Sequence, residues 1–575
     1  MSESLTYQGK IITTPNHYNM TKYLLGCICS LLLMLPSGLS AQRSAEERPP
    51  VTRAFFLNNA FVVQSPGKVI DLGGVLIRDG LIQAVGKDLK APADAKVLEA
   101  DSMYIYAGFI DGLSHLGVPK PKEEEEEGNN RRGGQREYNP SYERAGIQTE
   151  RSVTDMLSAE DKALSEMRAI GFTAAHVVPR GGMLPGQGSV ILLDGKDVGK
   201  MVVSEGSSLF AQFQGASGVY PNTDMAIMSK FRELYQQARQ HKTHAGDYAK
   251  NARGMNRPAQ NDVLAAFGSS IDGKRPIFFA VDGIKEMYRA ITLSEELGFL
   301  LAIADVTMGH KAIAPLKASG ASVYLTLDLP KAKKDDKKEE ETDAEKIKLE
   351  EQRAAAMQMH EEQAAMLTKA GIPFGFSTVS AKAKEIRANL GRMIKAGLTE
   401  DQALAALTTG PAKMLGLSDV MGTVEKGKIA NLVVTDQPYF SEGANVRYVF
   451  VDGMPSEYEV KKKKKAGDPD AVVVVAGDWS LEIDVPMAQM ASPTLTIVNE
   501  DGSLSGKLVS GMGTEEISNM SLDGDNLTFS YSTDGGGQTV TVSFDLTIDG
   551  NSLEGTMSAG SFGSFDVEGD RDPEK

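Results

Sequence analysis

The chain has 575 residues, of which 41% are hydrophobic and 24% are charged, and its formal net charge at pH 7 is −16. One hydrophobic core cannot organise a chain of this length, so we expect roughly two to four domains. The acidic balance disfavours nucleic acid and anionic membrane surfaces as partners, because both attract concentrated positive charge.

Residues 1–41 predict an export signal, with Met20 as the working start. A basic residue precedes a short apolar run at 24–35, and small residues follow it at 36–41. The run is too short for a comfortable membrane span. We therefore expect a periplasmic or secreted mature chain that starts close to Gln42 and has no stable membrane span.

Both cysteines of the chain, Cys27 and Cys29, lie inside this signal. A mature chain without cysteine has no disulfide, no thiolate metal site and no cysteine nucleophile. A lipoprotein attached to lipid through Cys27 is the alternative interpretation of the same segment.

Short alternating strands are predicted on both sides of a long central region. Residues 54–63 and 74–86 alternate apolar and polar side chains, and Asp79-Gly80 is a tight hairpin signal. A second run of strands follows much later in the chain. Neither group has enough strands to bury a face alone, so we predict one β-sandwich made from residues 42–106 and 418–460.

Residues 107–417 alternate strands with helices, which indicates parallel strands joined by crossover helices. The apolar run 103–110 predicts a buried strand that ends at Asp111, where a parallel barrel places its reactive residues. The polar insertion at 119–152, with an acidic run at 123–127, is predicted to be mainly a solvated loop. Residues 331–351 are predicted to be a charged surface insertion that grades into a helix at 352–370.

The last part of the chain has a different pattern. A Lys-rich linker at 461–470 leads into residues 471–575, where short alternating strands are separated by Gly-Asp and Asp-Gly turns. This pattern predicts a small antiparallel barrel or sandwich. We expect its single tryptophan, Trp479, to fill the core of this domain.

The stretch Ala107-Gly-Phe-Ile-Asp-Gly-Leu-Ser-His-Leu-Gly117 resembles the first barrel strand of the amidohydrolase superfamily, Pro-Gly-Phe-Ile-Asp-x-His-x-His. Residues 398–417 resemble the closing helices of the same superfamily. Residues 171–193 and 231–238 resemble its imidazolonepropionase-like, exported bacterial type. The resemblance implies an α/β fold with a (β/α)8 TIM-like barrel over 107–417. It also implies hydrolysis of non-peptide carbon–nitrogen bonds in small cyclic amides or related compounds.

The resemblance further implies one or two divalent ions such as zinc, held by histidines at strand ends and by an aspartate on the last strand. In this chain Leu113 replaces the first histidine, and Ala280 stands about where the fifth strand would carry one. Ser377 or Thr378 replaces the aspartate. The sequence therefore predicts a degenerate metal site, with no metal at all or a rearranged zinc site.

His115 is the tentative ligand of such a rearranged site, and the weaker candidates are His176, Asp282, Asp305 and His310. Each of them also fits a structural role, and the two aspartates are suited to capping the helices that follow them. Three alternatives stay open: a metal-dependent hydrolase, a metal-free enzyme, and an inactive relative that acts as a ligand-binding or scaffold protein. The expected partners are a small-molecule ligand and either a second copy of the chain or a partner enzyme.

Overall fold

The computed structural model describes two compact units of the chain, residues 1–460 and residues 461–575, and each is described here by itself. The predicted signal, the acidic run, the Lys-rich linker and most of the 331–351 insertion lie outside the described residues. The described residues are 53–120, 140–331, 344–458 and 475–571, without 196, 217, 484, 486–491, 501–502, 512, 518, 524, 536–537 and 560–563.

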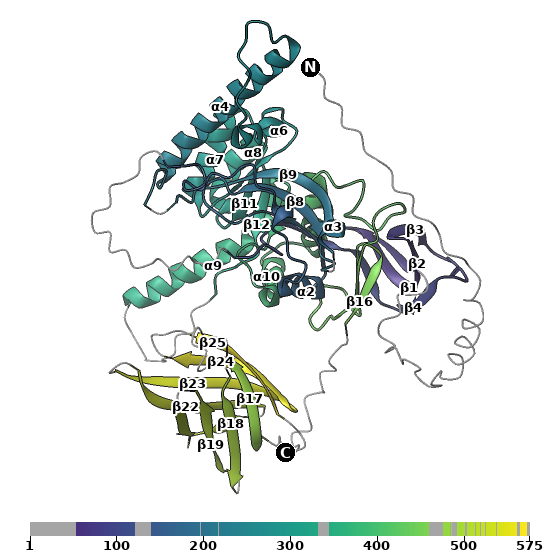
Figure 1. Ribbon diagram of the computed structural model, residues 1–575. Helices are drawn as coiled ribbons and strands as arrows, with labels where there is room; N and C mark the ends of the chain where they lie inside the picture. The colour runs from purple at the N-terminus through teal and green to yellow at the C-terminus, as the bar shows by residue number, and fades with distance from the viewer. Residues whose placement is uncertain are drawn as a thin grey trace, which may run out of the picture. The chain divides into compact units, whose positions relative to one another are not determined.

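The first unit contains an eight-stranded sheet that draws strands from both sides of the central region (Figure 1). Strand β5 pairs antiparallel with β14, so that Ala107 lies opposite Leu432. Strand β1 pairs with β2 on one side and with β4 and β5 on the other, so strands from both flanks of the central region belong to one sheet. The strands are β1 (Ala54–Ser65), β2 (Lys68–Arg78), β3 (Leu81–Gly86), β4 (Lys96–Glu99), β5 (Tyr104–Ala107), β14 (Leu432–Thr435), β15 (Val446–Val451) and β16 (Met454–Glu457).

The second sheet of this unit has eight strands in the order β13-β12-β11-β10-β9-β8-β7-β6. All neighbouring pairs are parallel except those of β8, which is antiparallel to both β7 and β9. The expected regular (β/α)8 repeat is thus interrupted, because β7 and β8 form a hairpin with no helix between them. The strands are β6 (Phe109–Ser114), β7 (Phe172–Val177), β8 (Gly186–Leu192), β9 (Val202–Gln212), β10 (Ile277–Ala280), β11 (Leu301–Val306), β12 (Ser322–Thr326) and β13 (Phe374–Ser377).

The two end strands of this order, β6 and β13, lie next to each other. The N–H of Thr378, directly after β13, donates to the carbonyl of Leu113 in β6 at 3.1 Å. A Cβ on Gly112 of β6 would lie 2.0 Å from the ring of Tyr324 in β12 and 2.8 Å from the carbonyl of Phe376 in β13. The glycine at this position therefore lets β6 approach β12 and β13 closely.

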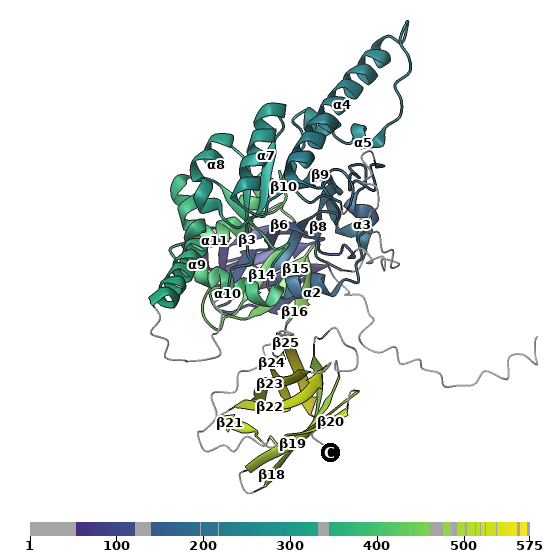
Figure 2. The ribbon, with the colours of Figure 1, turned by 90° about the vertical axis from the view of Figure 1, so that its left-hand side faces the viewer.

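Helices connect most of these strands. Helices α4, α7 and α8 lie beside one another, and α7 packs against β11 (Figure 2). The helices and 3-10 turns are η2 (Val153–Asp155), α2 (Lys162–Ala169), α3 (Val198–Met201), α4 (Asp224–Lys250), α5 (Asp262–Ala265), α6 (Gly268–Ile271), α7 (Ile284–Leu297), η3 (Gly309–Ala312), α8 (Ile313–Ser319), α9 (Ala344–Ala370), α10 (Ala383–Lys395), α11 (Glu400–Leu407) and α12 (Thr409–Met414). Among the described residues, no helix is long and apolar enough to cross a membrane.

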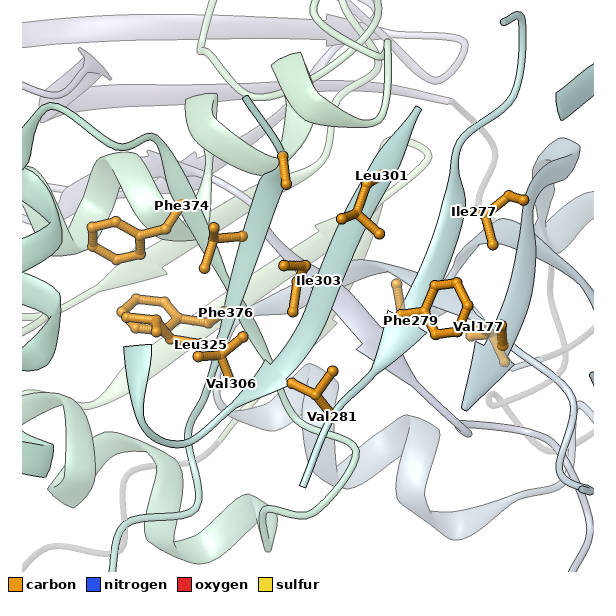
Figure 3. Packing of buried hydrophobic residues seen from close by; sticks show 14 of the residues in the cluster. Val177, Ile277, Phe279, Val281, Leu301, Ile303, Val306, Leu325, Phe374 and Phe376 are labelled. Carbon is orange, nitrogen blue, oxygen red and sulfur yellow. The ribbon is translucent and has the colours of Figure 1, made fainter. Parts of the chain in front are cut away.

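The parallel strands are apolar on both faces, and successive residues pack into different clusters. In β10, Ile277 and Phe279 join the large core between strands and helices (Figure 3). Phe278, the residue between them, joins a second cluster with side chains from β6, β9, β11 and β12. This period of two, buried on both sides, is what a parallel sheet covered by helices requires.

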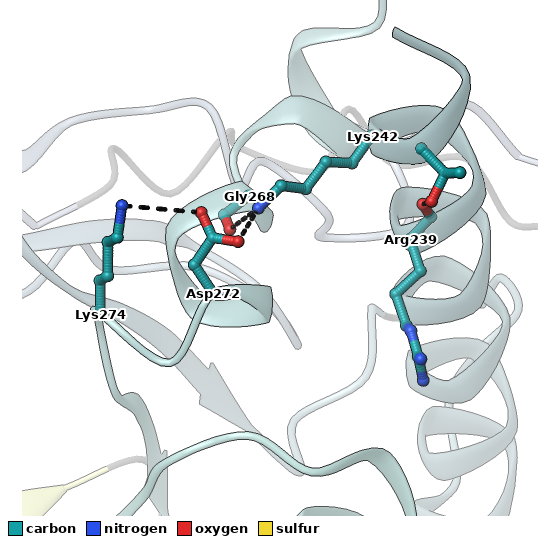
Figure 4. Close-up of polar contacts among 6 residues, drawn as sticks. Arg239, Lys242, Gly268, Asp272 and Lys274 are labelled. Carbon is teal, nitrogen blue, oxygen red and sulfur yellow. Dashed lines mark hydrogen bonds and ion pairs between the residues drawn. The ribbon is translucent and has the colours of Figure 1, made fainter. Parts of the chain in front are cut away.

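Helix α4 is held at its middle by a polar contact as well as by packing. The Lys242 ammonium donates to the carbonyl of Gly268 at 3.0 Å and to the Asp272 carboxylate, and Lys274 approaches the same carboxylate at 4.0 Å (Figure 4). These groups are partly exposed, so the ion pairs contribute modestly to stability.

The second unit is an antiparallel sheet of nine strands in the order β20-β19-β18-β17-β25-β24-β23-β22-β21. The ring of Trp479 is fully buried, its Nε1 donates to the carbonyl of Val475 at 3.0 Å, and Arg571 lies over it at 4.9 Å. The strands are β17 (Gly477–Ile483), β18 (Thr494–Glu500), β19 (Ser503–Ser510), β20 (Gly513–Ile517), β21 (Ser521–Asp523), β22 (Asn526–Gly535), β23 (Gln538–Asp549), β24 (Ser552–Ala559) and β25 (Ser564–Arg571).

Candidate functional site

The ends of β6, β11 and β13 carry a connected group of polar side chains. Asp111 of β6 accepts hydrogen bonds from the backbone N–H and the hydroxyl of Thr378. Ser377, the last residue of β13, donates to the carbonyl of Leu113 at 3.1 Å and lies 3.2 Å from the Asp305 carboxylate of β11. The result is a continuous hydrogen-bond network that joins the three strands.

Asp111 is the most deeply buried carboxyl of this network, with no exposed surface. Its Oδ1 accepts from the N–H groups of Leu113 and Thr378, both at 3.2 Å. These hydrogen bonds lower the pKa of Asp111, but burial outweighs them and raises that pKa to about 7. The group is therefore close to half protonated near neutral pH. Asp111 is the third residue of β6, and in the sequence it is marked by the apolar run 103–110 directly before it. The sequence gives no sign of its protonation state.

Asp305 has an unusual backbone, with φ of +56°, at an irregularity in the pairing of β11 with β12. Aspartate tolerates this left-handed conformation better than most residues. Its Oδ2 accepts from the hydroxyl of Ser380 at 2.7 Å. Burial raises the pKa of Asp305, and the hydrogen bonds from Ser380 and Ser377 offset part of that rise.

His115 follows the last residue of β6, and its Nδ1 lies 2.8 Å from the carbonyl oxygen of Val178. Burial lowers the pKa of His115 to about 4, so the ring is neutral at pH 7. A carbonyl only accepts hydrogen bonds, so Nδ1 carries the proton and Nε2 keeps its lone pair. His115 is therefore in the protonation state that a ligand or a base needs.

His176 in β7 is fully buried, and both of its ring nitrogens are engaged. Nδ1 lies 3.0 Å from the carbonyl oxygen of Gly112, and Nε2 lies 2.8 Å from the hydroxyl of Ser208. Burial lowers its pKa to about 4. A ring whose two nitrogens are satisfied by protein groups is a structural element, and we do not place His176 in the functional site.

The two predicted helix caps are wrong. Asp282 is exposed; helix α7 has Gly283 as its N-cap without a side-chain hydrogen bond, and the Asp282 N–H instead donates to Glu286 at 2.7 Å. Asp305 binds Ser377 and Ser380, and the next helical turns begin several residues later. In both cases the φ/ψ of the turn, and not the residue type, decides which residue caps the helix.

His310 lies in η3 and not in the polar network. Its ring is 5.8 Å from that of His360 in α9, edge to face, and Nδ1 of His360 contacts the carbonyl oxygen of Thr307 at 2.8 Å. Burial lowers the pKa of His310. The structure thus brings Asp305 into the network with Asp111, Ser377 and Thr378, and leaves Asp282 and His310 outside the hydrogen bonds of that network.

The donor set does not fit the divalent ion that the family resemblance implies. Within the described ranges, no three His, Cys, Asp or Glu side chains are grouped so that they could hold a metal. Leu113 and Ala280 instead belong to one apolar cluster with Phe210, Phe278 and Tyr324. A catalytic zinc requires about three protein ligands, and a cluster of carbon atoms supplies none.

Three comparisons place this geometry among known proteins. Residues 215–455 match the model of the Amidohydrolase family. An amidohydrolase of known structure from Thermotoga maritima MSB8 is 22% identical, with a TM-score of 0.56, over 70% of this chain and 99% of its own. A search of curated proteins found no match.

Other solved structures are more distant. A Xaa-Pro dipeptidase with bound methionine in its active site is 17% identical, with a TM-score of 0.41, over 70% of this chain and 100% of its own. Molinate hydrolase is 14% identical, with a TM-score of 0.40, over 70% of this chain and 95% of its own. At these values they carry no argument about activity. Residues 215–455 thus match the Amidohydrolase family, and the likeness to the Thermotoga structure shows a shared mixed α/β fold.

Proposed function

We propose that residues 53–458 form an amidohydrolase-superfamily domain that binds a small molecule and has lost the metal-dependent hydrolysis of its family. The observation that carries this proposal is the apolar packing of Leu113 and Ala280, at two positions where the family places metal-binding histidines. Ser377, which with Thr378 stands where the family places its last-strand aspartate, is engaged with the backbone of β6 and with Asp305.

The physical argument concerns the water that a metal-dependent hydrolase must activate. A bound ion lowers the pKa of its water, and the barrel without an ion does not. His115 alone supplies one neutral nitrogen, which is too little to hold a catalytic ion. The strand ends of an α/β barrel remain a usual setting for small-molecule binding. Ligand binding without rapid amide hydrolysis is therefore the function that these side chains support best.

A second candidate is a hydrolase of the imidazolonepropionase-like type that acts on non-peptide carbon–nitrogen bonds of small cyclic amides. It is favoured by the raised pKa of Asp111 and Asp305 in one network. A carboxyl that titrates close to neutral pH is suited to moving protons in catalysis. In this version the carboxyls of the barrel carry out the proton transfers that the family gives to its last-strand aspartate.

The deciding experiment measures the metal content of the purified mature chain, before and after incubation with zinc, together with hydrolysis of a panel of cyclic amides. We expect zinc well below one ion per chain and no hydrolysis above background. His115→Ala should leave both values unchanged, as should His241→Ala, a control at a half-buried histidine in α4.

Two results would change the proposal. About one tightly bound ion per chain, with hydrolysis lost in His115→Ala but kept in His241→Ala, would establish the metal-dependent enzyme. Hydrolysis that is insensitive to chelators but lost in Asp305→Asn would establish the metal-free enzyme.

A further inference from the structure

A small cavity lies away from the apolar cluster, between helix α4 and two loops of the barrel. Its volume is about 180 Å³, and it is lined by Tyr142, Ile147, Tyr220, Lys230 and Glu233 together with Pro140 and Ala145. The loops are those that follow β6 and β9, and such loops form the ligand-binding face of α/β barrels. The cavity corresponds to about six water volumes, so it suits a molecule of a few heavy atoms.

The two charged side chains that line this cavity differ in their exposure to solvent. The Lys230 side chain is only 16% exposed, whereas its partner Glu233, 3.0 Å away, is 47% exposed. The Lys230 ammonium also lies 6.0 Å from the ring centre of Tyr142. A half-buried cation with an exposed partner can still bind a second anion, because the ammonium has three N–H donors and Glu233 accepts from one of them.

The remaining polar groups of the cavity are also donors. The side chains of Tyr142 and Tyr220 line the cavity, and each is half-buried. With Lys230 they give three side chains that can donate to one acceptor group, and Ile147, which is fully buried, supplies an apolar wall. This combination is complementary to a carboxylate attached to a short apolar body.

We propose that this cavity is a binding site for a small monocarboxylate, whose carboxylate accepts hydrogen bonds from Lys230, Tyr142 and Tyr220. The site does not depend on the function proposed above, because none of its side chains belongs to the network of Asp111 and Asp305. Glu233 lies at its exposed side, where it can contact an amino group if the acid carries one.

The test is calorimetric titration of the mature chain with acetate, propionate and glycine, each against sodium chloride at equal ionic strength. We expect propionate to bind, and Lys230→Met to weaken that binding about tenfold or more, the effect of one lost hydrogen bond between charged groups. Lys250→Met, at a lysine whose side chain is 80% exposed near the end of the same helix, should bind as the parent does.

Further variants keep the test decisive if Lys230→Met does not fold. The double variant Tyr142→Phe with Tyr220→Phe removes only two hydroxyls, and it should also weaken propionate binding. Stronger binding of glycine than of propionate, lost in Glu233→Gln, would assign the site to amino acids among the monocarboxylates. Heats equal to those of chloride, or propionate binding that is unchanged in both the double variant and a folded Lys230→Met, would overturn the proposal.

Discussion

Replacing Asp111 with asparagine should make the first unit more resistant to rising pH. The pKa of Asp111 is about 7 in the folded chain, against 3.8 for an ordinary aspartate. Between these values the unfolded chain releases the proton while the folded chain keeps it, so stability falls as pH rises. Above pH 7 the carboxylate is ionised in both states and the loss stays constant. At ~1.4 kcal/mol per pKa unit, the loss amounts to about 4 kcal/mol.

Asparagine suits this site because it is close in shape and can keep the contacts. Its Oδ1 can accept from the N–H groups of Leu113 and Thr378, and its amide can donate to the Thr378 hydroxyl. Relative to the parent, Asp111→Asn should therefore gain about 4 kcal/mol in the free energy of unfolding between pH 4 and pH 8.

Urea unfolding at several pH values, followed by far-ultraviolet circular dichroism, measures this gain. Tryptophan fluorescence is unsuitable because the chain has a single tryptophan, Trp479, which lies in the second unit. Asp419→Asn, at an exposed carboxylate, controls for the loss of one charge. If the difference between Asp111→Asn and the parent were the same at every pH, the argument from burial would be wrong.

Three further predictions test other parts of the chain. Gly112→Ala should destabilise the first unit by about 1–3 kcal/mol, since its Cβ would overlap the neighbouring ring of β12, whereas Gly391→Ala, in open space within α10, should be neutral or stabilising in the same denaturation assay. Arg571→Gln should lower the stability of residues 461–575 by about 1 kcal/mol or more through loss of the contact with Trp479, and an unchanged fluorescence melting curve would contradict this. N-terminal sequencing of exported protein should begin close to Gln42, and an intact signal in that material would count against export.

Periodicity in the sequence was enough to predict a mixed α/β fold and a separate all-β C-terminal part. In strands such as β10, successive side chains pack on opposite faces of the sheet. The apolar character of each side chain can be read directly from the sequence. The antiparallel direction of β8 was harder to predict from the sequence, because a buried strand has the same composition whether it is parallel or antiparallel to its neighbours. The hairpin from β7 into β8 changes the strand order of the barrel, and the alternation of apolar residues does not indicate it.

Some features of the candidate site could likewise be predicted from the sequence, and others could not. The substitution of Leu113 is visible in the sequence, because leucine has no atom that can bind a metal. The network of Asp111 with Thr378 was not predictable, since it joins residues at opposite ends of the central region. The caps assigned to Asp282 and Asp305 failed because a residue type alone does not determine the φ/ψ of a turn.

The pairing of β5 with β14 has a consequence for the order in which the chain can fold. Strand β5 cannot pair with β14 before Leu432 has been synthesised. The first sheet therefore stays incomplete until nearly the whole first unit has emerged from the ribosome. During that time the edge of β5 is open to other strands, which is a risk for aggregation. Contacts this distant in sequence also slow folding, since the loop must close before the contact can form.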